Sequence, residues 1–253
     1  MAMRHILSAI YKADQDYHLI EDNDRICVGV SGGKDSMLLL YALKLYSGMA
    51  ERHDGRHFTV SGIHLEMGFG NMDFTEADAF AKDKDIELIH YNTDIYEILK
   101  QHPADEDGRI SCSLCSRLKK GALATASHEY GFTKVAYAHH ADDAIETLFM
   151  NMIFGGRINT FDPAMHLTHN DTDYIRPLIY CFEKDIANTV RLEQIPVVES
   201  TCPVDKHTSR QVIKEYLEET YKQFPEARHN FLVALSNTER TKLWVKGKDW
   251  RNV

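Results

Sequence analysis

The chain has 253 residues, which is enough for one large α/β domain with a small appendage and a well-buried core. Its formal net charge of -9, from 29 basic and 38 acidic residues, excludes indiscriminate attraction to nucleic acid, so a polyanionic partner would need a local basic patch. No apolar run reaches about eighteen residues, the length that spans a bilayer, and the first residues form no signal-peptide pattern. We therefore expect a soluble, cytoplasmic protein without a membrane partner.

Short β-rich runs alternate along the chain with segments of helical periodicity. The predicted strands are residues 25–30, 58–65, 86–92, 134–138, 174–179 and 196–199. The clearest predicted helices are residues 37–46, 116–130 and 142–154. This alternation indicates βαβ units and hence an α/β fold with a doubly wound, mostly parallel sheet. Because the pattern becomes wholly helical near residue 205, we expect a core domain of residues 1–204 and a helical C-terminal segment of residues 205–253.

The strongest local signal is the first predicted strand and the segment that follows it. An apolar strand passes into a glycine turn and then into an apolar helix. The turn has the sequence Ser31-Gly32-Gly33-Lys34-Asp35-Ser36. Glycines let the backbone approach a phosphate, and the free N–H groups and dipole of a helix N-terminus favour an anion. The segment predicts a phosphate-binding loop that differs from the Walker pattern; a turn that merely closes a βα connection is the alternative.

Five cysteines, an odd number, argue against a disulfide framework and for metal or thiol chemistry at some of them. Cys112 and Cys115 form a C-x-x-C pair, which is compatible with cluster ligation, a redox dithiol or sulfur carrier, or a structural role. The sequence has no second C-x-x-C pair to complete a zinc site. Cys27 within the first strand and Cys181 after an apolar run are expected to be inert core residues.

Two adjacent carboxylates, Asp142 and Asp143, follow the predicted strand 134–138. Parallel sheets place their ligand crevice at this end of a strand, so these carboxylates would hold Mg²⁺ against phosphates bound at the predicted loop. The alternative is that Asp142 only caps the helix that follows. His139 and His140 are expected to line the crevice from opposite faces. Residues 155–173, rich in turn and polar residues, predict a long excursion before the next strand.

The segment from Ser31 to Ser36 resembles the PP-loop of the ATP-pyrophosphatase superfamily, whose members hold ATP by its phosphates and transfer AMP to a substrate oxygen. The implied fold is the adenine nucleotide α-hydrolase-like fold. Further matching segments are residues 112–121, 138–143, 175–178, 202–203 and 210–213. In this order they resemble the TtcA-type tRNA 2-thiocytidine synthetases from about residue 20 to about residue 235.

The resemblance implies ATP-dependent thiolation of tRNA, in which the C2 oxygen of a cytidine is adenylated and replaced by sulfur delivered through a [4Fe-4S] cluster. Three cysteines hold the cluster in that family, and they match Cys112, Cys115 and Cys202 here. A cluster with three thiolate ligands leaves one iron free for external sulfide. The implied cofactors are ATP, Mg²⁺ and the cluster. The implied partners are tRNA, a sulfur donor such as a cysteine desulfurase or free sulfide, and an electron donor, with a homodimer left open.

The resemblance also assigns individual site residues. Asp142 and Lys119 match positions that related thiolases use in catalysis, and Asp35 completes the predicted catalytic set. The predicted nucleotide-binding residues are Ser31, Gly32, Gly33, Lys34, Asp35, Ser36, His64 and Asp142.

Binding of RNA would depend on local basic patches. Arg117, Lys119 and Lys120 cluster beside the C-x-x-C pair, and basic residues surround Trp244 and Trp250 in the tail. Cations neutralise phosphates and indoles stack on unpaired bases, although a basic tail is also typical of a solvated chain end. Two other functions stay open from the residues: a PP-loop ligase of the lysidine synthetase type, and a non-catalytic iron–sulfur or sulfur-relay protein that responds to nucleotide.

Overall fold

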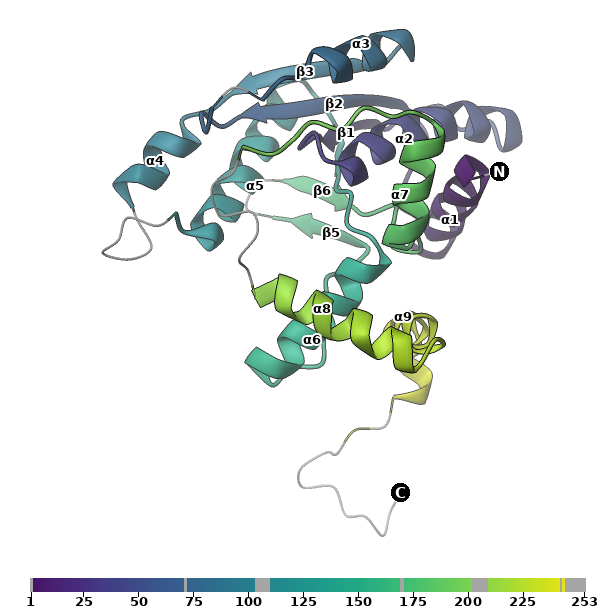
Figure 1. Ribbon diagram of the computed structural model, residues 1–253. Helices are drawn as coiled ribbons and strands as arrows, with labels where there is room; N and C mark the ends of the chain where they lie inside the picture. Colours follow the sequence, from purple (N-terminus) through teal and green to yellow (C-terminus); the bar gives the residue numbers. More distant parts are fainter. Residues whose placement is uncertain are drawn as a thin grey trace.

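The computed structural model describes residues 2–70, 72–102, 110–168, 171–201, 209–241 and 243 (Figure 1). Within this part of the chain, six strands form one sheet in the order β3-β2-β1-β4-β6-β5. The strands are β1 Arg25–Gly29, β2 Thr59–Glu66, β3 Glu87–Asn92, β4 Lys134–Ala136, β5 Ala164–Leu167 and β6 Thr172–Ile175. All pairs are parallel except β5 with β6. The predicted mostly parallel α/β sheet is confirmed.

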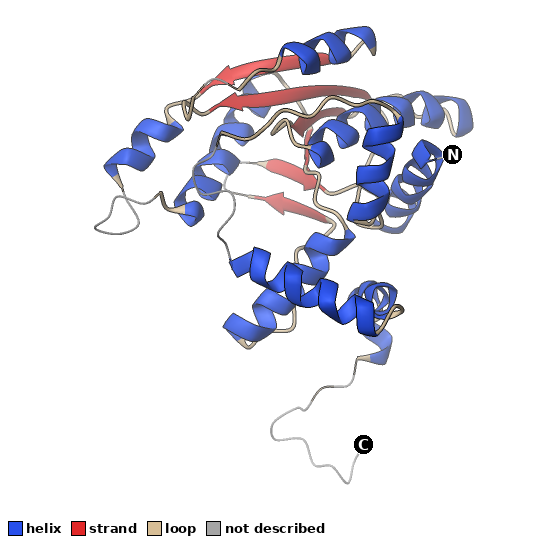
Figure 2. Cartoon of the chain, in the orientation of Figure 1, coloured by secondary structure: helices blue, strands red, loops and turns tan. Residues whose placement is uncertain are grey.

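Helices cover both faces of the sheet (Figure 2). They are α1 Ala2–Tyr17, α2 Lys34–His53, α3 Thr75–Asp83, α4 Ile95–Gln101, α5 Cys112–Glu129, α6 Ala141–Gly155, α7 Glu183–Leu192, α8 Ser209–Gln223 and α9 Ala227–Ser236, followed by a 3₁₀ turn, Thr238–Arg240. Side chains alternate across β1: Ile26 and Val28 join the core that holds α1, α2 and α7, whereas Cys27 joins the core under α5. None of the described helices is both long and apolar enough to cross a bilayer.

The predicted strand at residues 196–199 is wrong. Residues 195–200 have no regular secondary structure, and the backbone N–H of Val198 donates to the carbonyl oxygen of Gly32 at 2.9 Å. An extended segment can hydrogen-bond to a loop as well as to a strand, so the composition of residues 196–199 could not show which of the two partners it has. The last parallel strand also ends at Ile175, earlier than predicted, just before the Arg176-Pro177 turn, because proline has no N–H to donate to a sheet.

Strand β5 lies within residues 155–173, the segment predicted as an excursion without a strand. It is an edge strand of four residues that alternates between exposed and half-buried positions. Such a strand has no continuous apolar pattern, and its register comes from pairing with β6. The sequence signal for it was therefore weak.

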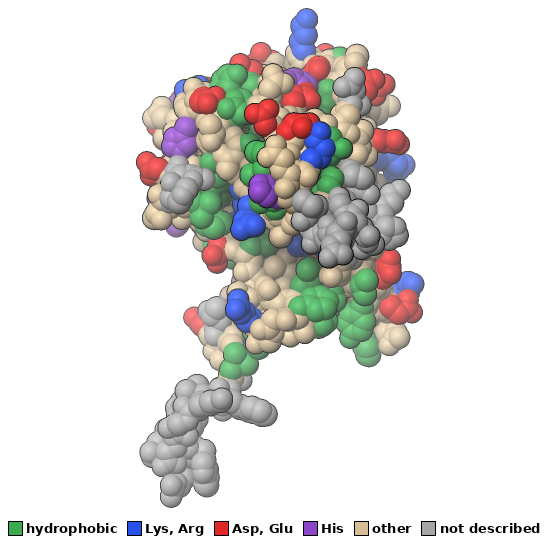
Figure 3. Space-filling view, turned by 90° about the vertical axis from the view of Figure 1, so that its left-hand side faces the viewer, with side chains coloured by type: hydrophobic (Ala, Val, Ile, Leu, Met, Phe, Trp, Pro, Cys, Tyr) green, Lys and Arg blue, Asp and Glu red, His purple; other side chains and the backbone are tan. Residues whose placement is uncertain are grey.

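The C-terminal helices α8 and α9 pack on α6, away from the sheet (Figure 1). Ile145 of α6 meets Ile213 and Leu217 of α8 in a separate apolar cluster. The predicted boundary at residue 204 falls outside the described residues, so the division into two parts stays a prediction. Apolar side chains gather on the lower part of this face of the molecule (Figure 3). The exposed apolar residues of α6 and α8 include Phe154 and Tyr216.

A buried carboxylate joins the N-terminal helix to the rest of the core. The side chain of Asp14 is 1% exposed and accepts hydrogen bonds from the hydroxyl of Tyr46 at 2.7 Å and from Arg56 at 2.8 Å. It also accepts the backbone N–H of Ile20 at 2.9 Å. This carboxylate accepts from three donors, and two of them, the Tyr46 hydroxyl and the Ile20 N–H, would otherwise be buried without an acceptor.

We expect Asp14→Ala to lower the free energy of unfolding by about 3–5 kcal/mol, because Tyr46 and the backbone N–H of Ile20 would lose their acceptor. Arg56 would also lose its buried carboxylate partner and keep only the more exposed Asp54. The matched control is Lys12→Ala, which removes an exposed pair with Asp16 on the same helix and should cost less than about 1 kcal/mol. Urea unfolding measures both values. Equal losses for the two variants would contradict the role given to Asp14.

Candidate active site

The segment between β1 and α2 forms a closed loop at the carboxyl end of the first strand. The Ser36 hydroxyl donates to the carbonyl oxygen of Gly33 at 2.9 Å and accepts the backbone N–H of Ser31 at 3.2 Å. Gly32 has a φ of +85°, a left-handed conformation that glycine adopts without strain. The loop therefore presents backbone N–H groups at the start of α2, as an anion site requires.

A cavity of about 600 Å³ opens above this loop. Five predicted nucleotide-binding residues line it: Ser31, Gly33, Asp35, Ser36 and His64. The other lining residues come from the ends of β1, β2 and β4 and the chain just after them, from α5, from Asp143 of α6, and from Val198, Ser200 and Thr201. The carboxyl ends of parallel strands and their following loops thus meet at one crevice. Gly32, Lys34 and Asp142 are outside the lining, so their contact with a nucleotide stays a prediction.

Lys34 turns toward α7. Its Nζ lies 3.1 Å from Asp35 Oδ2 and 3.0 Å from Glu183 Oε1. Lys214 of α8 also contacts Glu183, at 2.6 Å. Burial alone would raise the pKa of Glu183, but its hydrogen bonds to Lys214 and Lys34 lower that pKa to about 2. Glu183 therefore stays ionised and holds Lys34 between two carboxylates.

Asp35 lines the cavity and has one carboxylate oxygen without a hydrogen-bond partner among the described residues. Its Oδ2 accepts from Lys34, whereas its Oδ1 is buried and has no hydrogen-bond partner in the described part of the chain. A buried carboxylate oxygen without a partner is costly unless a ligand satisfies it. This atom therefore fits a cation or a donor group of a bound ligand.

The two adjacent aspartates have different surroundings. Asp142 Oδ2 accepts the backbone N–H of Glu183 at 2.7 Å, and its Oδ1 lies 3.5 Å from Arg228 Nε. Asp142 therefore supports the first turn of α7, and burial raises its pKa. Asp143, by contrast, lines the cavity. The sequence favoured Asp142 as the catalytic member, and that role stays a prediction.

The alternative that Asp142 caps the helix after the strand is wrong. The cap of α6 is His140, whose side chain accepts the backbone N–H of Asp143, while Asp143 accepts the backbone N–H of His140. His139 lines the cavity and His140 does not. The side chains of the two histidines thus differ in direction, as expected. The cause is the helix cap at His140 and not the alternation of a strand, because β4 already ends at Ala136.

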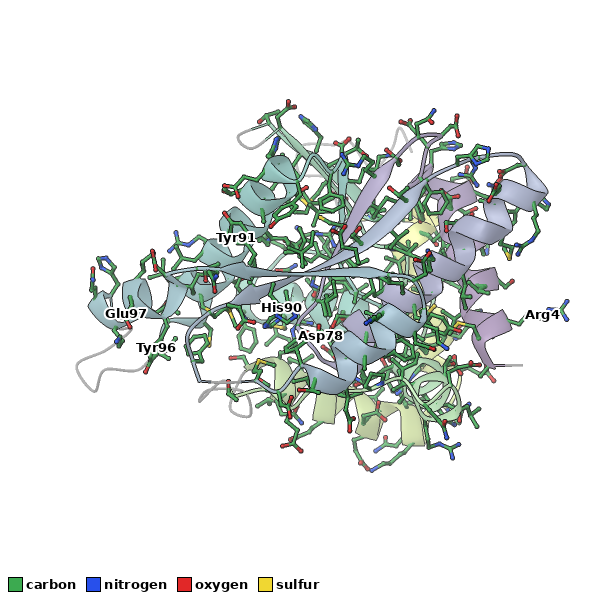
Figure 4. The ribbon with its side chains drawn as sticks, turned by 90° about the horizontal axis from the view of Figure 1, so that it is seen from above. Arg4, Asp78, His90, Tyr91, Tyr96 and Glu97 are labelled. Carbon is green, nitrogen blue, oxygen red and sulfur yellow. The ribbon has the colours of Figure 1, made fainter. Side chains whose placement is uncertain are left out.

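Aromatic rings support His64 from outside the cavity. His64 Nδ1 lies 2.9 Å from the carbonyl oxygen of Val30, and the His64 ring lies 3.9 Å from the ring of Phe74. Behind them, His90 of β3 contacts Asp78 of α3 at 2.9 Å and Glu66 at 2.8 Å (Figure 4). Burial alone would lower the pKa of His90, but these two carboxylates raise it. His90 thus ties α3 to β2 through these two carboxylates.

One face of α5 joins the C-x-x-C pair to the cavity. Cys112 is exposed at the first residue of the helix, and Cys115 is buried one turn later. Ser116, Lys119 and Lys120 follow on this helix and line the cavity. Lys119 and Lys120 form no ion pair with any residue that the structure describes. The cavity therefore has two cations available for an anionic ligand.

The third predicted cluster ligand, Cys202, lies outside the described residues. Ser200 and Thr201, immediately before it in the chain, line the same cavity as Ser116. Among the described residues, no group of three or more His, Cys, Asp or Glu side chains could hold a metal ion. The predicted three-cysteine site therefore stays a prediction, with Cys112 and Cys115 described.

Residues 4–221 match the PP-loop domain family. The chain belongs to this family. Among its relatives, the tRNA-cytidine(32) 2-sulfurtransferase of Dichelobacter nodosus is 37% identical over 90% of this chain and 83% of the relative. The enzyme of the same name from Coxiella burnetii is 34% identical over 95% of this chain and 92% of the relative. The resemblance inferred from the loop and cysteine motifs is confirmed.

A solved structure shares the fold. The U34-tRNA thiolase NcsA from Methanococcus maripaludis, determined with its [4Fe-4S] cluster, superposes with a TM-score of 0.72. The alignment covers 97% of this chain and 81% of that protein, at 19% sequence identity. At this identity the likeness establishes the PP-loop fold alone.

Sequence reasoning missed several residues around the PP-loop. Glu183 contacts Lys34 and Val198 contacts Gly32, and both lie more than a hundred residues beyond the loop in the chain. Arg228 contacts Asp142 from a different helix. None belongs to a local motif. Only the paired charges of Lys34 and Glu183 give a signal, and a sequence with 67 charged residues offers many such pairs: 29 basic and 38 acidic.

The two PP-loop glycines should respond differently to substitution. At Gly32, φ is +85° and an added Cβ would lie 2.8 Å from Val198 Cβ, so Gly32→Ala should lower the melting temperature without any ligand. At Gly33, an added Cβ would meet only Ser31 Oγ, at 3.4 Å. Gly33→Val should melt near the wild-type temperature but lose the rise that ATP causes, because its side chain would occupy the phosphate site. A full ATP-dependent rise in Gly33→Val would contradict the assignment of the loop.

The cysteines should differ in reactivity. Burial raises the pKa of both Cys27 and Cys181 to about 12 and encloses both thiols, whereas Cys112 is exposed. Iodoacetamide at mildly alkaline pH should therefore modify Cys112 in the folded, cluster-free protein and leave Cys27 and Cys181 unmodified. Peptide mass spectrometry measures the labelling, with urea-unfolded protein as the control in which every cysteine reacts. Rapid labelling of Cys27 before unfolding would contradict the packing described for β1.

Proposed function

We propose that this protein is an ATP-dependent tRNA 2-thiocytidine synthetase. ATP adenylates the C2 oxygen of a cytidine and releases pyrophosphate, sulfide attacks C2, and AMP leaves with the oxygen. The names of its relatives support cytidine 32 of tRNA as the target. The observation that carries the proposal is one cavity that is lined by the PP-loop at one side and by the α5 residues next to the C-x-x-C pair at the other.

The geometry of α5 supports this combination of activation and sulfur transfer. Cys112, Cys115 and Lys119 are spaced so that they follow one helix face, and a rise of about 1.5 Å per residue separates Cys115 from Lys119 by about 6 Å along the axis. A substrate carbonyl activated beside the loop would therefore lie within a few helical turns of the cysteine pair. Lys119 would balance the negative charge that builds up as AMP leaves.

The residues fit the two inorganic cofactors. Cys112 and Cys115 supply two thiolates at the start of a helix, and the proposed third ligand is Cys202. When bound, a cluster with three protein ligands supplies an iron that can accept sulfide. Asp35, through its unpartnered Oδ1, and Asp143 are the carboxylates that would hold Mg²⁺ near the nucleotide phosphates. Neutralising those phosphates makes pyrophosphate a better leaving group.

The tRNA would approach from the α5 side of the cavity. Arg117 and Lys120 are exposed there, beside the half-buried Lys119, so the chain has a local basic patch despite its net charge of -9. The proposal includes a sulfur donor such as a cysteine desulfurase or free sulfide, an electron donor for the cluster, and a cytoplasmic location where tRNA is modified. It also includes the helical C-terminal segment as an appendage of the core, and leaves the homodimer for direct measurement.

A ligase of the lysidine synthetase type uses the same kind of loop but has no need for cysteines beside the cavity. The position of Cys115 one residue before Ser116, a lining residue, favours thiolation over that ligase and over a non-catalytic sensor.

We expect Cys112→Ser, Cys115→Ser and Cys202→Ser each to lower bound iron and sulfide and to eliminate thiocytidine formation, since each removes one proposed cluster ligand. Cys27→Ala and Cys181→Ala are the matched controls, because both thiols are enclosed in the core and neither residue lines the cavity. Iron and sulfide assays on anaerobically reconstituted protein, together with nucleoside mass spectrometry of tRNA, measure the effects. Full iron content and full thiolation in Cys202→Ser would overturn the three-ligand site.

A further inference from the structure

Arg176, which follows β6, is a buried cation whose hydrogen bonds go to uncharged acceptors. Its residue is 4% exposed, and its Nε donates to His139 Nδ1 at 3.3 Å. Its Nη1 donates to the carbonyl oxygen of Asp162 and its Nη2 to Met165 Sδ. No carboxylate of the described chain forms an ion pair with it. Burying a charged guanidinium without a carboxylate partner costs free energy, which implies that Arg176 has a role beyond packing.

The contact with Arg176 fixes the proton of His139. A guanidinium N–H can only donate, so His139 Nδ1 must accept, and the single imidazole proton must lie on Nε2. A second proton, on Nδ1, would place two donors and two positive charges against each other. The ring therefore stays neutral while Arg176 remains in place.

The groups around His139 reinforce this state. They are Arg176 after β6, Arg210 of α8, Asp143 and His140 at the start of α6, and Tyr137 after β4. Burial, Arg176, Arg210 and His140 lower the pKa of His139 to about 4, and Asp143 opposes them. At neutral pH the pKa is thus far below the pH, and the imidazole carries no charge.

The position of His139 brings its free nitrogen to the PP-loop. Strands β1 and β4 are paired with Val28 opposite Ala136, and Ser31 and His139 each stand three residues further on. Both line the cavity. His139 Nε2 bonds to no described residue, and His139 lines the cavity, so this nitrogen is available to a ligand bound there.

We propose that His139 is a neutral hydrogen-bond donor whose Nε2–H contacts a phosphate oxygen of the nucleotide at the PP-loop, and that Arg176 is the positioning residue that fixes its tautomer. This rests on nucleotide binding as part of the proposed function. His139 stabilises charge on the phosphate and does not act as a general base toward the cavity, because the lone pair on Nδ1 already accepts a hydrogen bond from Arg176.

The first test is the tautomer. In ¹⁵N-labelled protein, the His139 ring should remain in the neutral Nε2–H form between about pH 5 and pH 8, and its Nε2 signal should move when a non-hydrolysable ATP analogue with Mg²⁺ is added. His139→Gln assigns the signal. Arg176→Met should raise the midpoint of the His139 titration and release the second tautomer. A His139 ring that is protonated near neutral pH in the wild type, or that ignores the nucleotide, would overturn the proposal.

The second test is the rate of pyrophosphate release at saturating ATP. His139→Ala should lower it about 100-fold, as for the loss of one preorganised donor, whereas His139→Gln, whose amide N–H replaces Nε2–H, should retain most of it. His166→Gln is the matched control, because His166 lies on β5 with a half-exposed side chain outside the cavity lining. Equal loss in the Ala and Gln variants, with both folded, would overturn the proposal while leaving the proposed function intact. Absence of pyrophosphate release from the wild type with tRNA would instead overturn the proposed function.

Discussion

The contact between Gly32 and Val198 is the constraint on which the site depends. The N–H of Val198 donates to the Gly32 carbonyl, and the side chain of Val198 fills the space where a Cβ of residue 32 would lie. The loop can therefore adopt its shape only with glycine at this position and with residues 195–200 laid across it. This crossing brings Ser200 and Thr201 into the lining of the cavity, to which α5 also contributes.

Charge organises the other side of the same loop. Arg210, Lys214 and Arg228 of the two C-terminal helices contact Asp143, Glu183 and Asp142 in turn. Because Glu183 also holds Lys34, α8 is linked to the PP-loop by two successive ion pairs. These pairs are partly shielded from water, which makes them stronger than ion pairs between fully exposed side chains. The C-terminal helices thus complete the electrostatic surroundings of the cavity although they contribute none of its lining residues.

The cavity is lined by both basic and acidic side chains, and they are not all paired with one another. Lys119 and Lys120 face it from α5, whereas Asp35 and Asp143 face it from α2 and α6. A nucleotide with Mg²⁺ satisfies both sets, because its phosphates need cations and its metal needs carboxylates. The neutral His139 adds a hydrogen-bond donor for the phosphates without adding a positive charge near the metal. This arrangement explains why an acidic protein can hold polyanions at one edge of its sheet.

The sequence by itself determined the α/β sheet, the PP-loop and the cysteine pair, because each is visible in the local order of residues. The PP-loop, for example, is an apolar strand, a glycine turn and a helix start within a dozen residues. It did not determine the strand at residues 164–167, whose register comes from β6, or the course of residues 195–200, which pair with a loop. Only the tertiary structure decided that Asp142 supports α7 while Asp143 faces the cavity, since adjacent helical residues point about 100° apart and the packing of α7 selects between them. It also decided the tautomer of His139, because the donor that fixes it lies 37 residues away in the chain.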